Sequence, residues 1–144
     1  MPIAVYPALL FTVALLVTTA YFLMGGLPLL VLDHDTALDA RFIRGFFNLY
    51  YRAAFVTAMG AALSYAGLGQ AGFALGAAAL ALVVVALRRR LIPTMDALGA
   101  QIQASAPQAI RRFRQVHCMA LLVNLVQLAL LVWALTRLSL SAGA

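Results

Sequence analysis

The sequence predicts an all-α integral membrane protein with four transmembrane helices in an antiparallel up-down bundle. Its 144 residues are 65% hydrophobic, with a mean hydropathy of +1.01. Only 10% are charged, compared with about 25% in ordinary soluble domains. The apolar residues form four runs, each long enough to cross a bilayer core of about 30 Å. The chain has room for this one domain, residues 1–144, and none for a separate soluble domain.

The first helix is expected over residues 8–32. The segment before it, MPIAVYP, has no positive charge, so the n-region of a signal peptide is not expected. Gly25, Gly26 and Pro28 lie in the last third of this helix, and proline removes a backbone donor. Two interpretations follow: a hinge or broken helix that lines a site, or a helix that ends near the membrane interface.

A short polar loop follows the first helix. Thr36 and Asp39 are spaced like a capping box at the start of the next helix. Asp33, His34 and Asp35 offer oxygen and nitrogen ligands for a metal, but adjacent residues rarely surround one ion without help from elsewhere. We therefore expect a solvated loop that caps a helix.

The second helix is expected over residues 41–68 and is longer than a bilayer requires. Its first part carries Arg41, Arg44, Asn48 and Arg52. This part either protrudes or lies among the headgroups, with Arg52 reaching back to the surface. In the alternative, Asn48 and Arg52 point into the bundle. Further along the same helix, glycine and serine at positions 60 and 64 form a small-xxx-small pair, typical of close helix packing.

The third helix is expected over residues 72–90, after an uncharged glycine-rich turn. Gly72 and Gly76 form a GxxxG pair, which indicates either a dimer face or, more simply, packing of the second and third helices. The run Arg88 to Arg90 should end this helix and anchor it to anionic headgroups.

The longest connection is expected over residues 91–110, where Pro93, Gly99 and Pro107 interrupt the pattern. Its apolar residues recur at spacings of about one helical turn, which predicts a short amphipathic helix on the membrane surface. These residues are Ile92, Met95, Leu98 and Ile102.

The fourth helix, expected over residues 107–138, is the best candidate to carry function. At roughly 100° per residue, Arg114, His117, Asn124 and Gln127 fall within about 140° of arc. Such groups are costly in hydrocarbon, so they should face protein, water or a ligand. The nearest polar groups are expected on the second helix. The predicted polar seam or ligand site comprises His117, Asn124, Gln127, Arg114, Asn48, Arg52 and Tyr51.

Arginine positions predict the orientation. Nine of the ten arginines flank the two connections on one face, and only Arg137 lies on the other. By the positive-inside rule both termini should be non-cytoplasmic. The absence of lysine and the richness in alanine and leucine indicate a bacterial inner membrane protein. A net charge of +6 placed at helix ends is a topology signal, so nucleic acid is not an expected partner.

Three stretches carry a family resemblance: RFIRGFFNLYYRA, LRRRLIPTMDAL and RRFRQVHCMALLVNLVQL. Together they resemble the transmembrane protein 205-like family, domain of unknown function 4149. The matching positions are Phe42, Phe46, Tyr50, Tyr51, Arg89, Arg90, Pro93, Phe113, His117, Ala120, Asn124 and Gln127. The stretch from residue 96 to 105 departs from the family by carrying little charge. The resemblance implies a four-helix membrane protein and no established activity.

Three functional hypotheses follow. In the leading one, the polar face fixes the packing of a small accessory or assembly subunit, which binds a larger membrane complex or a second copy of itself. In the second, His117, alone or together with His34, binds haem or a metal; otherwise no cofactor is expected. In the third, the polar face lines the path of a small-solute carrier or efflux component that acts as an oligomer. An enzyme is not expected, because the spans contain no acid–base pair and Cys118 projects about 100° away from His117.

Overall fold

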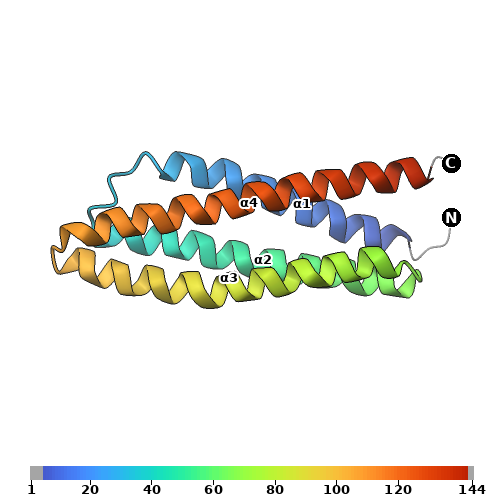
Figure 1. Cartoon of the computed structure of the whole chain (residues 1–144), viewed down its shortest axis with the longest axis horizontal. Coiled ribbons are helices and arrows are strands. Elements are labelled where there is room, and N and C mark those ends of the chain that lie inside the picture. Colours follow the sequence, from blue (N-terminus) through green and yellow to red (C-terminus); the bar gives the residue numbers. More distant parts are fainter. Residues whose placement is uncertain (1–4, 143–144) are drawn as a thin grey trace.

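The structure, a computed structural model, describes residues 5–142, with side chains described as far as residue 137. Residues 1–4, part of the uncharged leading segment, lie outside the described residues. The described chain forms four helices and no strand. They are α1 (Val5–Leu29), α2 (Ala37–Gly67), α3 (Ala71–Gln103) and α4 (Pro107–Ala142). The helices alternate in direction, and the start of α1 and the end of α4 lie at the same end of the bundle (Figure 1). The predicted antiparallel bundle is confirmed.

Three helices are long and apolar enough to cross a membrane. They are α1, α3 and the part of α4 from Pro107 to Arg137, whose most apolar windows have mean hydropathies of 2.0, 2.1 and 2.3. The helix α2 does not meet this criterion. Its first half carries one aspartate and three arginines, and its inward face carries tyrosines, so its mean hydropathy is lower.

The ends of α1 and α2 follow the expected chemistry. Thr36 is the N-cap of α2, and its hydroxyl oxygen accepts a hydrogen bond from the backbone N–H of Asp39 at 3.1 Å. The predicted cap is therefore confirmed, although the helix begins at Ala37, earlier than expected. Pro28 lies in the last turn of α1, which ends at Leu29. Of the two interpretations of this proline, the helix end is correct.

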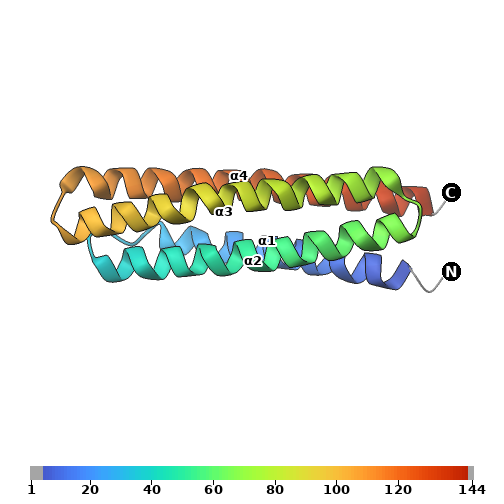
Figure 2. The same cartoon turned by 90° about the horizontal axis from the view of Figure 1, so that it is seen from below.

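The helix α3 does not end at its three arginines. It continues through residues 91–103, so the predicted long connection and the separate surface helix are wrong, and the connection comprises only residues 104–106. Figure 2 shows α3 running beside α4 up to this short connection. The physical reason is tertiary packing: Met95, Leu98 and Ile102 are buried in the main hydrophobic core, which also contains residues of α2 and α4. Burial of this stripe outweighs the backbone hydrogen bond that Pro93 removes.

Glycines set the distances between helices at particular points. A Cβ built at Gly60 would lie 2.4 Å from Cδ1 of Phe11, so α1 and α2 approach closely there, as the small residues at this position predicted. By contrast, a Cβ at Gly72 or Gly76 would meet no atom within 4 Å. The prediction that these two glycines pack α3 against α2 is therefore wrong.

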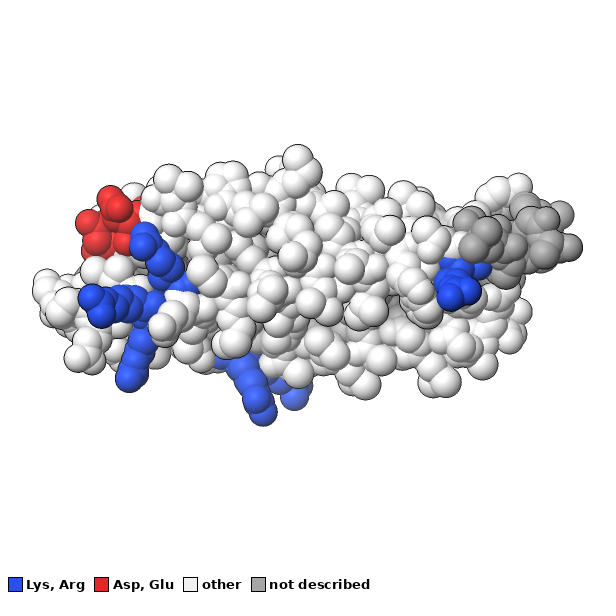
Figure 3. Space-filling model, turned by 45° about the horizontal axis from the view of Figure 1, so that its top comes forward, with Lys and Arg blue, Asp and Glu red and all other residues white. Residues whose placement is uncertain are grey.

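The outside of the bundle separates charge from apolar surface. On the face shown in Figure 3, most arginines lie toward the end that carries the loop between α1 and α2, and a wide uncharged zone follows them. Large apolar side chains are exposed on all the helices, among them Tyr21, Leu63, Leu75, Leu82, Leu122 and Trp133. The helix α4 packs less extensively on its neighbours than α2 does.

Candidate functional site: a buried polar seam and an adjoining apolar cavity

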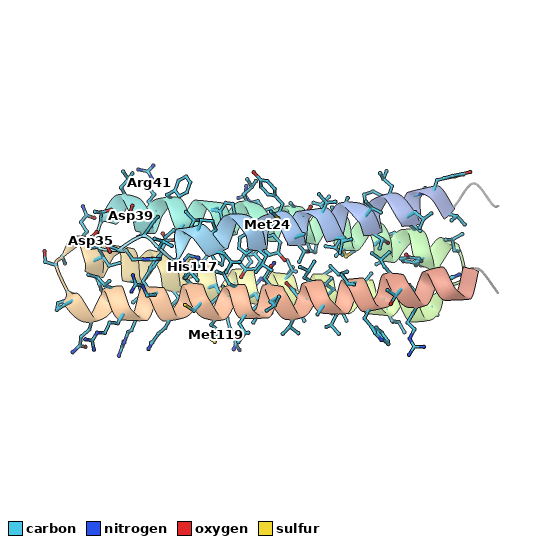
Figure 4. All side chains as sticks on the ribbon, turned by 90° about the horizontal axis from the view of Figure 1, so that it is seen from above. Met24, Asp35, Asp39, Arg41, His117 and Met119 are labelled. Carbon is cyan, nitrogen blue, oxygen red and sulfur yellow. The ribbon has the colours of Figure 1, made fainter. Side chains whose placement is uncertain are left out.

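The polar face of α4 points inward, as predicted. His117, Asn124 and Gln127 are only 0%, 1% and 5% exposed. Figure 4 shows His117 directed into the bundle, whereas Met119 on the same helix points outward. The 3.6-residue period explains this arrangement, because residues 117, 124 and 127 share one face of the helix.

The two histidines of the chain form a buried pair. Nδ1 of His117 lies 3.1 Å from Nε2 of His34, which belongs to the loop between α1 and α2. The Nδ1 atom of His34 is hydrogen-bonded to the carbonyl of Leu32. Arg114 reaches the same carbonyl with Nη2 at 3.2 Å. His34 has a φ of 61°, a left-handed conformation that turns the loop back toward α4.

The carbonyl of Leu32 determines the donor and the acceptor in the two hydrogen bonds of the His34 ring, one to this carbonyl and one to His117. A carbonyl can only accept, so Nδ1 of His34 must carry a hydrogen, and Nε2 of a neutral His34 is then an acceptor. Nδ1 of His117 is therefore the donor between the rings. Nε2 of His117 is then the ring nitrogen without a hydrogen; it is fully buried next to the backbone of Gly26 and has no hydrogen-bond partner of normal geometry among the described residues.

Apolar groups enclose the histidine pair. The ring of Phe47 meets His117 edge-on with centroids 5.2 Å apart, and Phe113 lies 5.8 Å from the ring of His34. The backbone of Gly26 also lies close to His117. A Cβ at Gly26 would lie 2.5 Å from Cδ2 of Leu121, so this glycine lets α1 approach α4 beside the pair.

A second polar group lies deeper in the bundle. The hydroxyl of Tyr50 donates a hydrogen bond to Oε1 of Gln127 at 3.1 Å, and Asn124 and Thr19 lie near the same hydroxyl. The hydroxyl of Thr19 donates to the carbonyl of Leu15 at 2.7 Å. Both polar atoms of the Asn124 side chain and Nε2 of Gln127 are buried without a hydrogen-bond partner in the described chain. We call the set His34, His117, Thr19, Tyr50, Asn124 and Gln127 the polar seam.

An apolar cavity adjoins the deep end of the polar seam. It has a volume of about 560 Å³, and Gln127 is one of its lining residues. All four helices contribute to its wall, and none of the described residues that line it is charged. Val83 of α3 and Leu130 and Trp133 of α4 line it while remaining 45–59% exposed, so its mouth opens between these two helices onto the apolar exterior. We call it the α3–α4 cavity.

Three of the remaining predicted site residues lie apart from the polar seam, whereas Arg114 meets its edge through the carbonyl of Leu32, which His34 also binds. Tyr51 is buried beside Phe47, and among the described residues its side chain has no hydrogen-bond partner. Asn48 accepts a hydrogen bond from Nε of Arg88 at 3.0 Å. Arg52 and Arg114 are exposed. Of the two interpretations of Arg52, the one in which it points into the bundle is therefore wrong, and Arg114 does not belong to the interior either. Their length lets both guanidinium groups stay outside the core.

Sequence reasoning missed two members of the polar seam, Tyr50 and Thr19. Tyr50 is adjacent to the predicted Tyr51, and the exact rotation of α2 decides which of the two hydroxyls meets α4. Thr12 and Thr19 are seven residues apart and therefore share one face of α1, a signal that was available. Within residues 5–142, no three His, Cys, Asp or Glu side chains gather in a group that would hold a metal ion.

Comparisons with known proteins return no relatives. No protein-family model matches this chain, and no curated protein and no solved structure is similar to it. The resemblance to the transmembrane protein 205-like family therefore stays a prediction that rests on the three motifs.

Proposed function

We propose that this protein spans the bacterial inner membrane with four helices, both termini on the non-cytoplasmic side. We further propose that it binds a small, neutral and largely apolar molecule in the α3–α4 cavity. The observation that carries this proposal is the cavity itself. Its volume of about 560 Å³ falls within the roughly 300–1,000 Å³ of small-molecule sites, which are mostly apolar and contain few polar groups.

The distribution of charge supports the membrane placement. Five arginines, at positions 41, 44, 111, 112 and 114, lie toward the end that holds the loops of residues 30–36 and 104–106, and four more, at positions 52 and 88–90, lie near the midpoints of α2 and α3. The positive-inside rule assigns the arginine-rich end to the cytoplasm. Only Arg137 lies toward the other end. The helix α2 is included as a fourth span because it packs against both α1 and α3. Its residues 53–67 contain no charge and extend about 22 Å, so Arg52 must reach the headgroups with its long side chain to complete a span of about 30 Å.

The unmatched amide beside the cavity supports a binding role. A buried polar group without a partner costs about 1–3 kcal/mol, and Nε2 of Gln127 is such a group. A ligand that supplies the missing partner recovers this energy. The cavity ends at Gln127 and does not continue along the seam to His117, which supports a binding component more than a continuous path for a solute.

A second candidate, the accessory or assembly subunit, is supported by one specific observation. Gly72 and Gly76 are exposed and lie one turn apart on α3. A Cβ built at either position would meet no described atom within 4 Å. In membranes such pairs let another helix approach closely. The occupant of this face would then be a helix of a larger membrane protein or of a second copy.

The haem or metal alternative has less support. Both ring nitrogens of His34 are occupied within the chain, so only Nε2 of His117 is free to coordinate. A visible absorption spectrum of the purified protein, compared with that of His117→Ala, tests this alternative directly.

Native mass spectrometry after purification in a mild detergent tests the proposal. Gly76→Leu places a side chain into the mouth of the cavity, whereas Gly45→Leu adds the same group on α2, where a Cβ meets nothing within 4 Å. We expect a bound small molecule on the wild type and on Gly45→Leu, and none on Gly76→Leu. A protein partner lost only in Gly76→Leu favours the second candidate. If the wild-type protein carries neither a small molecule nor a protein partner, both candidate functions are contradicted.

A further inference from the structure

We propose that the molecule bound in the α3–α4 cavity is a neutral membrane lipid with a carbonyl or similar hydrogen-bond acceptor, and that Gln127 donates to this acceptor. This inference rests on the proposed function and adds the chemical class of the ligand. Three features support it: the hydrogen bonds of Gln127, the uncharged character of the described lining residues, and the position of the mouth.

The hydrogen bonds of Gln127 select an acceptor on the ligand. Its side chain is 5% exposed and lines the cavity. The oxygen Oε1 is already used, because it accepts the hydroxyl of Tyr50 at 3.1 Å. The amide nitrogen has no partner among the described residues, so the group left to be satisfied is an N–H donor. Because this nitrogen is fully buried, it reaches a ligand when the side-chain amide turns toward the cavity that Gln127 lines, and the ligand atom that it meets must be an acceptor.

The lining of the cavity selects a neutral molecule. Its wall consists mainly of alanine, glycine, leucine and aromatic side chains, such as Ala77, Leu80 and Leu131, with no arginine, aspartate or histidine. Burying an unpaired charge against such a wall is strongly unfavourable. The other hydroxyls on the wall, of Thr12 and Tyr65, are hydrogen-bonded to each other at 2.9 Å. Gln127 is therefore the lining residue with an unmatched buried polar atom.

The mouth of the cavity selects a molecule that comes from the bilayer. The residues at the mouth, Val83, Leu130 and Trp133, are apolar and exposed. They lie on α3 and α4, which are both apolar enough to cross a membrane. A lipid can move into this opening laterally without crossing a polar surface. Its hydrocarbon part would replace bilayer contacts with contacts to the wall, and its acceptor would reach Gln127.

The single tryptophan of the chain provides a local probe, because Trp133 lines the cavity. Bromine atoms quench tryptophan fluorescence at contact distance. We would titrate the protein in detergent micelles with dibrominated methyl stearate, which carries an ester carbonyl, and with dibrominated octadecane, which has the same hydrocarbon and no acceptor. The variants are Gln127→Met, which keeps the side-chain length and removes the amide, and the pair Gly76→Leu and Gly45→Leu.

The expected result is saturable quenching, with the ester bound more tightly than the hydrocarbon by about three- to tenfold, the ratio expected for one hydrogen bond. Gln127→Met should remove this preference, Gly76→Leu should remove the saturable phase, and Gly45→Leu should behave like the wild type. If both probes quench the wild type with equal affinity, binding in the cavity is supported, but the proposed hydrogen bond from Gln127 to the ligand is refuted. If the saturable phase is absent, or persists in Gly76→Leu, neither probe occupies the cavity and the proposed function fails too. Circular dichroism of each variant establishes that it is folded.

Discussion

An alanine at Gly26 should leave the bundle less stable than an alanine at Gly45. Gly26 lies on α1 where this helix meets α4, and a Cβ built there would lie 2.5 Å from Cδ2 of Leu121. Gly45 lies on α2, and a Cβ there would meet nothing within 4 Å. Both substitutions add one methyl group to a helix. The difference between the two variants therefore isolates the contact between α1 and α4 beside His117.

The magnitude follows from two opposing effects. Alanine is more favourable than glycine in a helix by about 0.8–1.0 kcal/mol, so Gly45→Ala should be neutral or stabilising. Gly26→Ala gains the same amount and also inserts a methyl group into a filled space, which typically costs about 1–3 kcal/mol. We expect the free energies of unfolding of the two variants to differ by this second amount. The lower end applies if the end of Leu121, a flexible side chain, swings aside.

Unfolding by sodium dodecyl sulfate in mixed micelles, followed by far-ultraviolet circular dichroism, measures this difference. Leu121→Ala provides the control, because it empties the space that the new methyl group needs. In that background Gly26→Ala should cost less than in the wild type. Equal stability of Gly26→Ala and Gly45→Ala would refute the close approach of α1 and α4.

Three further predictions concern the histidines, the topology and the seam. Nitrogen-15 NMR of labelled histidine should show hydrogen on Nδ1 of both His34 and His117; a hydrogen on Nε2 of His117 would contradict the hydrogen-bond chain derived from the Leu32 carbonyl. The topology can be tested in a background in which the native cysteine is replaced by serine. There, Gln70→Cys should react with a membrane-impermeant thiol reagent from the periplasmic side, and Ser105→Cys only from the cytoplasmic side. The reverse pattern would show that the proposed orientation is inverted. Tyr50→Phe should destabilise the bundle by about 0.6 kcal/mol, up to about 1.7, in the same detergent titration, and an unchanged midpoint would mean that its hydroxyl is not bonded in the bundle.

Much of the fold was predictable because local signals agree with tertiary packing. Four apolar runs, the cap at Thr36 and the glycine-rich turn placed four helices in the right order and direction. The error came at Arg90, where basic residues and Pro93 resemble a helix end. Whether a helix survives a proline depends on the packing of the residues beyond it, here Met95 and Leu98, and this is a property of the folded bundle.

The candidate site was predictable only along one helix. Helical periodicity placed His117, Asn124 and Gln127 on one inward face. It did not identify their partners, because these come from α2 and from a loop, and their positions depend on how far each element is rotated or turned back. The left-handed conformation of His34, which brings its ring to His117, has no signature in the sequence. The α3–α4 cavity likewise depends on how far two helices diverge.

The continuation of α3 to Gln103 has a consequence for the part of the protein outside the membrane. Residues 91–103 rise about 1.5 Å each and so extend roughly 20 Å beyond Arg90, while the headgroup layer on one side of a bilayer is only about 5–8 Å thick. In the proposed orientation, with the arginines at the headgroups, the ends of α2, α3 and α4 would project into the cytosol as a small folded platform. The exposed ion pair of Arg44 and Asp96 lies in this region. Antibodies, proteases and soluble proteins can reach this platform without entering the bilayer.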